Sequence, residues 1–225
     1  MAAHHSGNNK LNMTVNIQNL RKEYSFHPLL EEEVKPDPLR QFEDWFNDAV
    51  NAKVDEPNAM VLSTAGAGGR VSARVVLLKG LENGSFLFFS NYTSRKGLQL
   101  DLNPNAALTF LWKEIGRQVR VEGRVRKISR AASKAYFNSR PADSRISALI
   151  SPQSSTIPDR AFLEALREGA ILDLGKNDPD CPADWGGYLV KPFLVEFWQG
   201  REYRLHDRIQ YRLNGKSWTI ERLAP

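Results

Sequence analysis

The sequence contains a single cysteine, Cys181, among its 225 residues. One thiol excludes an internal disulfide framework and is typical of a reducing compartment. No apolar run approaches the length that a membrane-spanning helix needs, and the polar N-terminus lacks the apolar stretch of a secretory signal. We therefore expect a cytoplasmic protein, with a disordered tail over residues 1–19 and a single domain over residues 20–225.

Several binding signatures are also missing. No GxGxxG motif opens a helix and there is no GxxxxGK[ST] motif, so neither a Rossmann nor a P-loop nucleotide site is supported. The net charge is +5, but Lys and Arg are interleaved with acids and never form a run of four, which disfavours a nucleic-acid binder and leaves discrete anion sites. The adjacent His4 and His5 lie in the tail, and we expect no metal site.

What the sequence does contain is a series of short strands with helices attached. A helix is predicted over residues 38–53, because Pro38 suits a first turn and apolar residues recur at helical spacing. Strands rich in β-branched and aromatic residues are predicted over residues 59–65, 71–81, 85–91, 106–112, 117–129, 187–199, 201–213 and 217–223. Further helices are predicted over residues 94–103 and 129–140, with Ser94 and Ser129 as their N-caps, and over residues 159–171. This order favours an α+β fold, mainly antiparallel β, built on a barrel with peripheral helices.

Three segments of this pattern carry candidate anion sites. In RVVLLK, strand alternation places Arg74 and Lys79 on opposite faces of a strand whose apolar middle we expect to be covered on both sides. They need not serve one ligand, and this segment alone favours a strand with charged ends over an anion site. In SNYTSRKG, Arg95 and Lys96 occupy the first turn of a helix, where cations oppose the helix dipole unless an anion docks there.

The third segment, YFNSRPADS, places Tyr136 and Arg140 four residues apart on one helix face, while Ser144 lies at the start of the next helix. These groups could converge on a phosphate, although an ordinary helical corner explains them equally well.

The stretch EFWQGREYRLHDR adds a fourth cluster. If RLHDR is extended, then Arg204, His206 and Arg208 alternate along a strand and face the same side. Cations held so close repel one another unless an anion lies among them. Together with the other segments, this cluster predicts two phosphorylated ligands.

Taken together, these stretches resemble the pyridoxamine/pyridoxine 5′-phosphate oxidase family, the FMN-dependent oxidases of vitamin B6 salvage. The resemblance rests on RVVLLKG, FFSNYTSRKG, RQVRVEG, YFNSRPADSRI, SPQSS, WGGY, EFWQGREYRLHDR and ERLAP, in this order. It implies an FMN-binding split β-barrel and a homodimer with two FMN sites at the subunit interface. The implied reaction passes a hydride from C4′ of pyridoxine or pyridoxamine 5′-phosphate to flavin N5. Dioxygen then becomes hydrogen peroxide, the product is pyridoxal 5′-phosphate, and the amine substrate also releases ammonia.

The resemblance also implies roles for individual residues. The FMN contacts would be Arg74, Val75, Val76, Leu77, Leu78, Lys79, Phe89, Ser90, Arg95, Lys96, Gln118, Gln153, Ser154, Trp198 and Arg208. The substrate would be held by Arg21, Tyr24, Lys79, Tyr136, Arg140, Ser144, Arg204 and His206. Of these, Arg204 and His206 would be catalytic and lie against the pyridine ring, with His206 kept neutral by its flanking arginines.

Three alternatives remain open at this point. One is a different flavin oxidase or reductase on the same barrel. Another is a module that carries FMN or pyridoxal phosphate without catalysis. The last is a basic β-barrel that binds nucleic acid, against which the scattered charge argues.

Overall fold

The structure, a computed structural model, describes residues 23–175 and 177–225. The predicted disordered tail therefore lies outside the described residues. Within them, no helix is both long and apolar enough to span a membrane, and no three His, Cys, Asp or Glu side chains are grouped to hold a metal ion.

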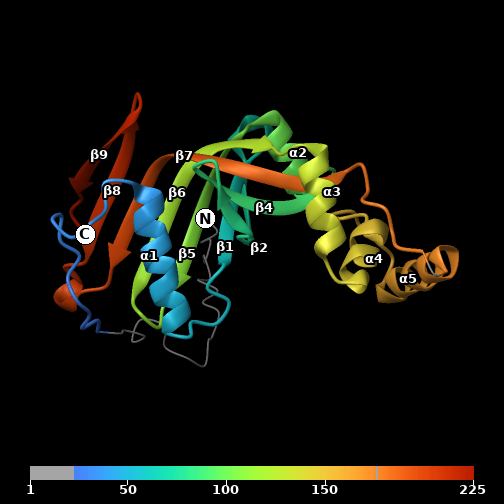
Figure 1. The fold of residues 1–225 in the computed structure, drawn as a ribbon, viewed down its shortest axis with the longest axis horizontal. Helices are drawn as coiled ribbons and strands as arrows, with labels where there is room; N and C mark the ends of the chain where they lie inside the picture. Colours follow the sequence, from blue (N-terminus) through green and yellow to red (C-terminus); the bar gives the residue numbers. More distant parts are fainter. Residues whose placement is uncertain (1–22, 176) are drawn as a thin grey trace, which may run out of the picture.

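Nine strands of the described chain form one antiparallel sheet that curls into a half-barrel (Figure 1). The strands are β1 (Ala59–Ala65), β2 (Val71–Leu77), β3 (Gly80–Glu82), β4 (Ser85–Asn91), β5 (Asn105–Trp112), β6 (Arg117–Lys127), β7 (Trp185–Gln199), β8 (Asp207–Asn214) and β9 (Ser217–Arg222). Their order is β2-β1-β5-β6-β7-β4-β3, and β8 pairs with both β7 and β9. The mainly antiparallel fold predicted from the sequence is confirmed.

The helices are peripheral, as predicted. They are α1 (Pro38–Asn51), α2 (Arg95–Leu102), α3 (Arg130–Ser139), α4 (Ala142–Ile150) and α5 (Arg160–Leu174), with short 3₁₀ turns η2 (Ala67–Gly69) and η3 (Glu202–Arg204). Ser94 and Ser129 cap α2 and α3 by accepting hydrogen bonds from backbone N–H groups of the first turn. Helices α3 to α5 extend from the end of the sheet opposite to β8 and β9 (Figure 1).

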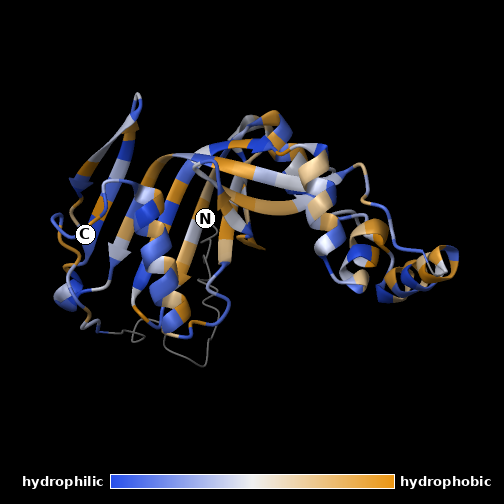
Figure 2. Cartoon of the chain, in the orientation of Figure 1, coloured by the Kyte–Doolittle hydropathy of each residue, from blue (hydrophilic) through white to orange (hydrophobic). Residues whose placement is uncertain are grey.

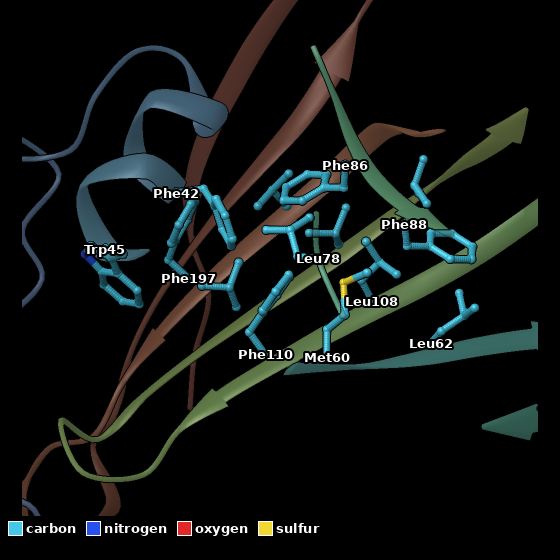
Figure 3. Packing of buried hydrophobic residues seen from close by; sticks show 14 of the residues in the cluster. Phe42, Trp45, Met60, Leu62, Leu78, Phe86, Phe88, Leu108, Phe110 and Phe197 are labelled. Carbon is cyan, nitrogen blue, oxygen red and sulfur yellow. The ribbon is translucent and has the colours of Figure 1, made fainter. Parts of the chain in front are cut away.

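The main core lies between α1 and the sheet. Buried residues alternate with more exposed ones along β1, β5 and β6, and Figure 2 shows hydrophobic and hydrophilic residues following one another within the sheet. Phe42 of α1 lies 4.9 Å from Phe110, and Trp45 lies 5.1 Å from Phe197, measured between ring centroids (Figure 3). A separate small cluster of Phe137, Cys181 and Trp185 ties α3 to the start of β7.

The structure corrects two predictions about β2. The strand lies at the edge of the sheet, with β1 as its only partner among the described strands, so Val75 is 65% exposed instead of covered. The predicted strand over 71–81 also breaks after Leu77, because the Lys79 N–H turns away to donate to Leu87 O of β4. Strand alternation therefore does not extend from Arg74 to Lys79.

The prediction that residues 201–213 form one strand is wrong for its first half. The Leu205 N–H donates to Glu202 O, and Tyr203 and Arg204 adopt φ of 56° and 62°, so the chain makes a tight turn before β8 begins at Asp207. Arg204, His206 and Arg208 consequently do not share one face of a strand. Gly200 correctly marks the end of β7 at Gln199, but it does not reveal the turn that continues through Leu205.

Candidate active site

The residues that the sequence singled out fall into two groups at opposite ends of β7. The first group surrounds β2, β4, α2 and α3 and consists of Arg74, Val75, Val76, Leu77, Leu78, Lys79, Phe89, Ser90, Arg95, Lys96, Tyr136, Arg140, Ser144, Gln153 and Ser154. The second group lies near β8 and consists of Tyr24, Gln118, Trp198, Arg204, His206 and Arg208. Arg21 lies outside the described residues.

The length of β7 separates the two groups. Trp185 begins the strand beside the first group, and Trp198, its next-to-last residue, lies within the second. At ~3.3 Å per residue, the strand path between them is roughly 40 Å. One chain therefore does not bring all the predicted residues into a single site.

The first group surrounds a cavity of about 350 Å³. Its lining includes Arg74, Val75, Val76, Leu77, Lys79, Phe89, Ser90, Lys96, Tyr136, Arg140, Gln153 and Trp185. The side chain of Leu78 lies instead in the main core (Figure 3), so only its backbone is left for a ligand. Arg95 and Ser154 line an adjoining cavity of about 470 Å³, which shares Gln153 with the first.

A hydrogen-bond network fixes Lys96 at the base of the cavity. Its Nζ donates to Gln153 Oε1 at 2.7 Å and to Ser90 Oγ at 2.9 Å, and Ser90 Oγ lies 3.2 Å from the same glutamine oxygen. The network joins β4, α2 and the loop after α4, which are far apart in the sequence. The next residue of that loop, Ser154, holds a φ of 75°, an uncommon conformation that requires support from its surroundings.

Arg74 is held equally firmly. Its guanidinium donates to Thr64 Oγ1 at 2.7 Å and to Ser72 Oγ at 2.6 Å, and both hydroxyls hydrogen-bond to Gln99 Oε1. Because its partners are neutral, the positive charge of Arg74 stays available to an anion.

The electrostatics of the cavity point to an anion. Burial, with a smaller contribution from Arg74, lowers the pKa of Lys96 to about 8, and burial together with the charge of Arg95 lowers the pKa of Arg74. Among the described residues, no carboxylate forms a salt bridge with Arg74, Lys79, Arg95, Lys96 or Arg140. Cations that lose hydration without gaining a carboxylate partner favour a bound anion.

An aromatic stack forms one wall of the cavity. The rings of Phe89 and Tyr136 lie 3.8 Å apart and nearly parallel, and the nearly parallel Trp185 ring lies 5.4 Å from Phe89 and 6.3 Å from Tyr136. The Arg140 guanidinium lies 4.9 Å from the Trp185 ring centroid, and its Nη1 is buried without a hydrogen-bond partner in the described chain. Burial lowers the pKa of Arg140, and an anionic ligand would satisfy the orphaned Nη1.

Sequence reasoning gave no role to Trp185, although the WGGY stretch that contains it was singled out. The two glycines explain its position. A Cβ at Gly187 would lie 2.5 Å from Ile128 and 2.9 Å from Phe89, so only glycine lets β7 approach the aromatic stack this closely. An aromatic residue directly before two strand glycines is the signal that could have identified it.

The second group is arranged around Trp198. The His206 ring centroid lies 4.6 Å from that of Trp198, and Tyr24 packs edge-on against both rings. The Arg201 N–H donates to His206 Nδ1 at 3.1 Å, so Nδ1 acts as an acceptor and a neutral His206 carries its proton on Nε2. Gln118 lies directly across from Trp198 on β6.

The side chains of the two arginines in this group, Arg204 and Arg208, differ in how firmly the protein holds them. Arg208 donates from Nε to Glu196 Oε1 at 2.9 Å and from Nη1 to Ala224 O at 2.7 Å. Arg204 is exposed in the η3 turn. One cation is therefore fixed in place, whereas the other is presented to solvent from a strained turn.

The chain is similar to several known proteins. Residues 46–168 match the family model described as pyridoxamine 5′-phosphate oxidase, and residues 185–225 match that of the pyridoxine 5′-phosphate oxidase C-terminal dimerisation region. The pyridoxine/pyridoxamine 5′-phosphate oxidase of Legionella pneumophila (strain Lens) is 49% identical over 93% of this chain and 97% of its own length. That of Cupriavidus taiwanensis is 52% identical over 93% of this chain and 99% of its own length.

Solved structures are similar as well. PhzG from Burkholderia lata 383, in complex with tetrahydrophenazine-1-carboxylic acid, superposes with a TM-score of 0.83 at 29% identity, over 90% of this chain and all of that one. A pyridoxamine 5′-phosphate oxidase-related, FMN-binding protein of Nostoc punctiforme shares the fold, with a TM-score of 0.66 at 19% identity over 82% of this chain and 97% of that one. The chain therefore belongs to the pyridoxamine 5′-phosphate oxidase family of enzymes.

Proposed function

We propose that the chain is an FMN-dependent oxidase that converts pyridoxine 5′-phosphate and pyridoxamine 5′-phosphate to pyridoxal 5′-phosphate. The observation that carries this proposal is the cavity beside β2, where Lys96, Arg74 and Arg140 are partly desolvated without carboxylate partners. Two phosphorylated ligands would supply the missing negative charge.

The residues at the α2 end of the cavity fit the FMN phosphate. Arg74 and Lys96 lie together at its base, and Arg95 and Ser154 line the adjoining cavity. Lys96 and Arg74 are already oriented by neutral hydrogen bonds, so little rearrangement is needed when a phosphate binds. When bound, FMN would accept the hydride from substrate C4′, and its reoxidation would reduce dioxygen to hydrogen peroxide.

The residues at the α3 end fit the substrate phosphate. Tyr136 and Arg140 line the same cavity as Lys79, and Ser144 lies in the first turn of α4. The phosphate is remote from C4′, so the energy of binding it can hold the pyridine ring in position for hydride transfer.

The second group would come from another copy of the chain. Because β7 separates Trp198, Arg204, His206 and Arg208 from the cavity of their own chain, a homodimer offers a way to join both groups. The match of residues 185–225 to a dimerisation region supports this arrangement. Each dimer would then hold two equivalent sites, each built from both subunits.

Arg204 and His206 would then contact the substrate ring. The planar guanidinium of Arg204 suits stacking over a pyridine, which lysine cannot reproduce. The Nε2–H of His206 would donate a hydrogen bond to the substrate, with Nδ1 held by Arg201. Unchanged kinetics in Arg204→Lys, or in His206→Asn across pH, would remove the respective residue from this role.

One experiment tests the proposal as a whole. The purified protein should be yellow, and its flavin absorbance should bleach when pyridoxine 5′-phosphate is added without oxygen. Admitting oxygen should restore the absorbance and produce hydrogen peroxide. A protein that cannot take up FMN would contradict the proposal.

A second candidate substrate class follows from the similarity to PhzG, whose structure holds a tricyclic carboxylic acid. Arg140 could pair with a carboxylate as well as with a phosphate. We expect turnover of the phosphorylated pyridines and none of tetrahydrophenazine-1-carboxylic acid, and the reverse pattern would favour the PhzG-like activity.

A further inference from the structure

Asp207, the acid of the RLHDR stretch, has no role in the proposed chemistry. Its side chain is only 15% exposed and accepts three interactions. Arg222 Nη1 donates to Oδ1 at 2.7 Å, the Leu29 N–H donates to Oδ2 at 3.1 Å, and Arg201 Nε lies 3.5 Å from the same oxygen. Asp207 thus joins β8 to the last strand and to a segment 178 residues earlier in the chain.

Arg222 completes this connection. Its Nε and Nη2 donate to the two oxygens of Glu31 at 2.6 and 2.7 Å, and Nη2 also donates to Leu29 O at 2.7 Å. Every nitrogen of the guanidinium is therefore engaged, and the fork geometry specifies where the segment around Leu29 lies. We refer to Asp207, Arg222 and Glu31 as the clasp.

The clasp holds the chain where it crosses the second group of site residues. Arg201, next to the clasp, donates a hydrogen bond to Phe26 O. Tyr24 then packs on His206 and Trp198, at centroid distances of 5.9 and 5.8 Å. The fit is close, because a Cβ at Gly200 would lie 2.7 Å from the Tyr24 ring and one at Gly116 would lie 2.3 Å from the Phe26 ring.

We propose that the clasp is a positioning device for the active site: Asp207, Arg222 and Glu31 hold the N-terminal segment so that Tyr24 lies against His206. The inference rests on the proposed function, in which Tyr24 and His206 contact the substrate. Since no clasp residue lines the cavity beside β2, and Arg208 is held by Glu196 and Ala224, the clasp acts on substrate binding and leaves FMN binding to residues that it does not hold.

The test compares Asp207→Asn and Glu31→Gln with Asp44→Asn. The control removes the carboxylate of Asp44, which lies on α1 away from both groups and forms an exposed ion pair with Lys35. Loss of charge-assisted hydrogen bonds in Asp207→Asn should raise the KM for pyridoxine 5′-phosphate about ten-fold. The kcat and the Kd for FMN should change by less than about two-fold, and Asp44→Asn should behave as the wild type.

Hydrogen exchange provides a readout independent of turnover. The Leu29 amide donates directly to Asp207, so its exchange should accelerate in Asp207→Asn and, through the shared Arg222, in the milder Glu31→Gln. Unchanged Leu29 exchange would overturn the clasp itself. Faster exchange with an unchanged KM, or a loss of FMN affinity in place of the KM effect, would overturn its positioning role.

A different result would contradict the proposed function: a wild-type protein that binds no FMN. In that case the exchange measurement still decides whether the clasp holds the segment.

Discussion

Replacing Arg140 by Met should separate the two phosphate sites. The substitution removes the guanidinium whose Nη1 is buried without a partner and which lies 4.9 Å from Trp185, but keeps most of the apolar stem. A charge-assisted hydrogen bond to the substrate phosphate contributes about 1.5–3 kcal/mol, whereas the contact with Trp185 exists with or without substrate. The loss of this hydrogen bond corresponds to a rise of roughly ten- to a hundred-fold in KM for phosphorylated substrate.

The assay is steady-state oxidation of pyridoxine 5′-phosphate, combined with fluorescence titration of FMN. Arg40→Met is the matched control, since it removes a 72% exposed arginine on α1 and changes net charge equally. We expect Arg140→Met to keep the wild-type Kd for FMN and the control to keep both constants. A large loss of FMN affinity with an unchanged KM would mean that Arg140 binds the flavin phosphate, which would refute the assignment.

Three further predictions concern the cavity and the core. Before ligand binds, the pKa of Lys96 is about 8, so at pH 9 Lys96 is protonated in only about a tenth of the molecules. Raising the pH from 7 to 9 should therefore weaken FMN binding about ten-fold in a fluorescence titration. An affinity for FMN that is independent of pH over this range would contradict the role of Lys96. Phe42→Ala should lower the free energy of unfolding of the FMN-free protein by about 3–5 kcal/mol in a urea titration, because Phe42 is 1% exposed, and a loss below 1 kcal/mol would show that the core repacks. Gly187→Ala should weaken FMN binding, because the added Cβ would lie 2.9 Å from Phe89; an unchanged Kd would mean that the aromatic stack does not contact the flavin.

Much of the fold follows from local patterns in the sequence. The structure confirms Ser94 and Ser129 as helix caps. Caps are predictable because they depend only on the residues within one turn. The strands were predicted where β-branched and aromatic residues cluster between turn residues, and the sheet contains them.

The two wrong strand predictions, for RLHDR and RVVLLK, have a cause outside the local sequence. Alternation in RLHDR predicted a strand, but Arg201 and His206 close a turn through a side-chain hydrogen bond that residue spacing does not reveal. The apolar middle of RVVLLK suggested a strand covered on both faces, yet β2 lies at an edge, and edge position depends on pairing order across the whole sheet.

The candidate site was predictable only in part. The cations were identified because their spacing is unusual, but no local pattern indicates that Lys96 and Gln153 meet through a hydrogen bond across 57 residues. The separation of the two groups along β7 emerges only from the folded chain.

The central claim, that two copies of the chain build each site, is tested most directly by complementation. Arg140→Met disables the first group and Arg204→Ala the second, so at a substrate concentration near the wild-type KM each homodimer should be nearly inactive. A heterodimer purified through two different affinity tags would contain one site that carries both substitutions and one site that carries neither. We predict that it recovers about half of the wild-type activity, whereas a heterodimer as inactive as either parent would show that each site lies within a single chain.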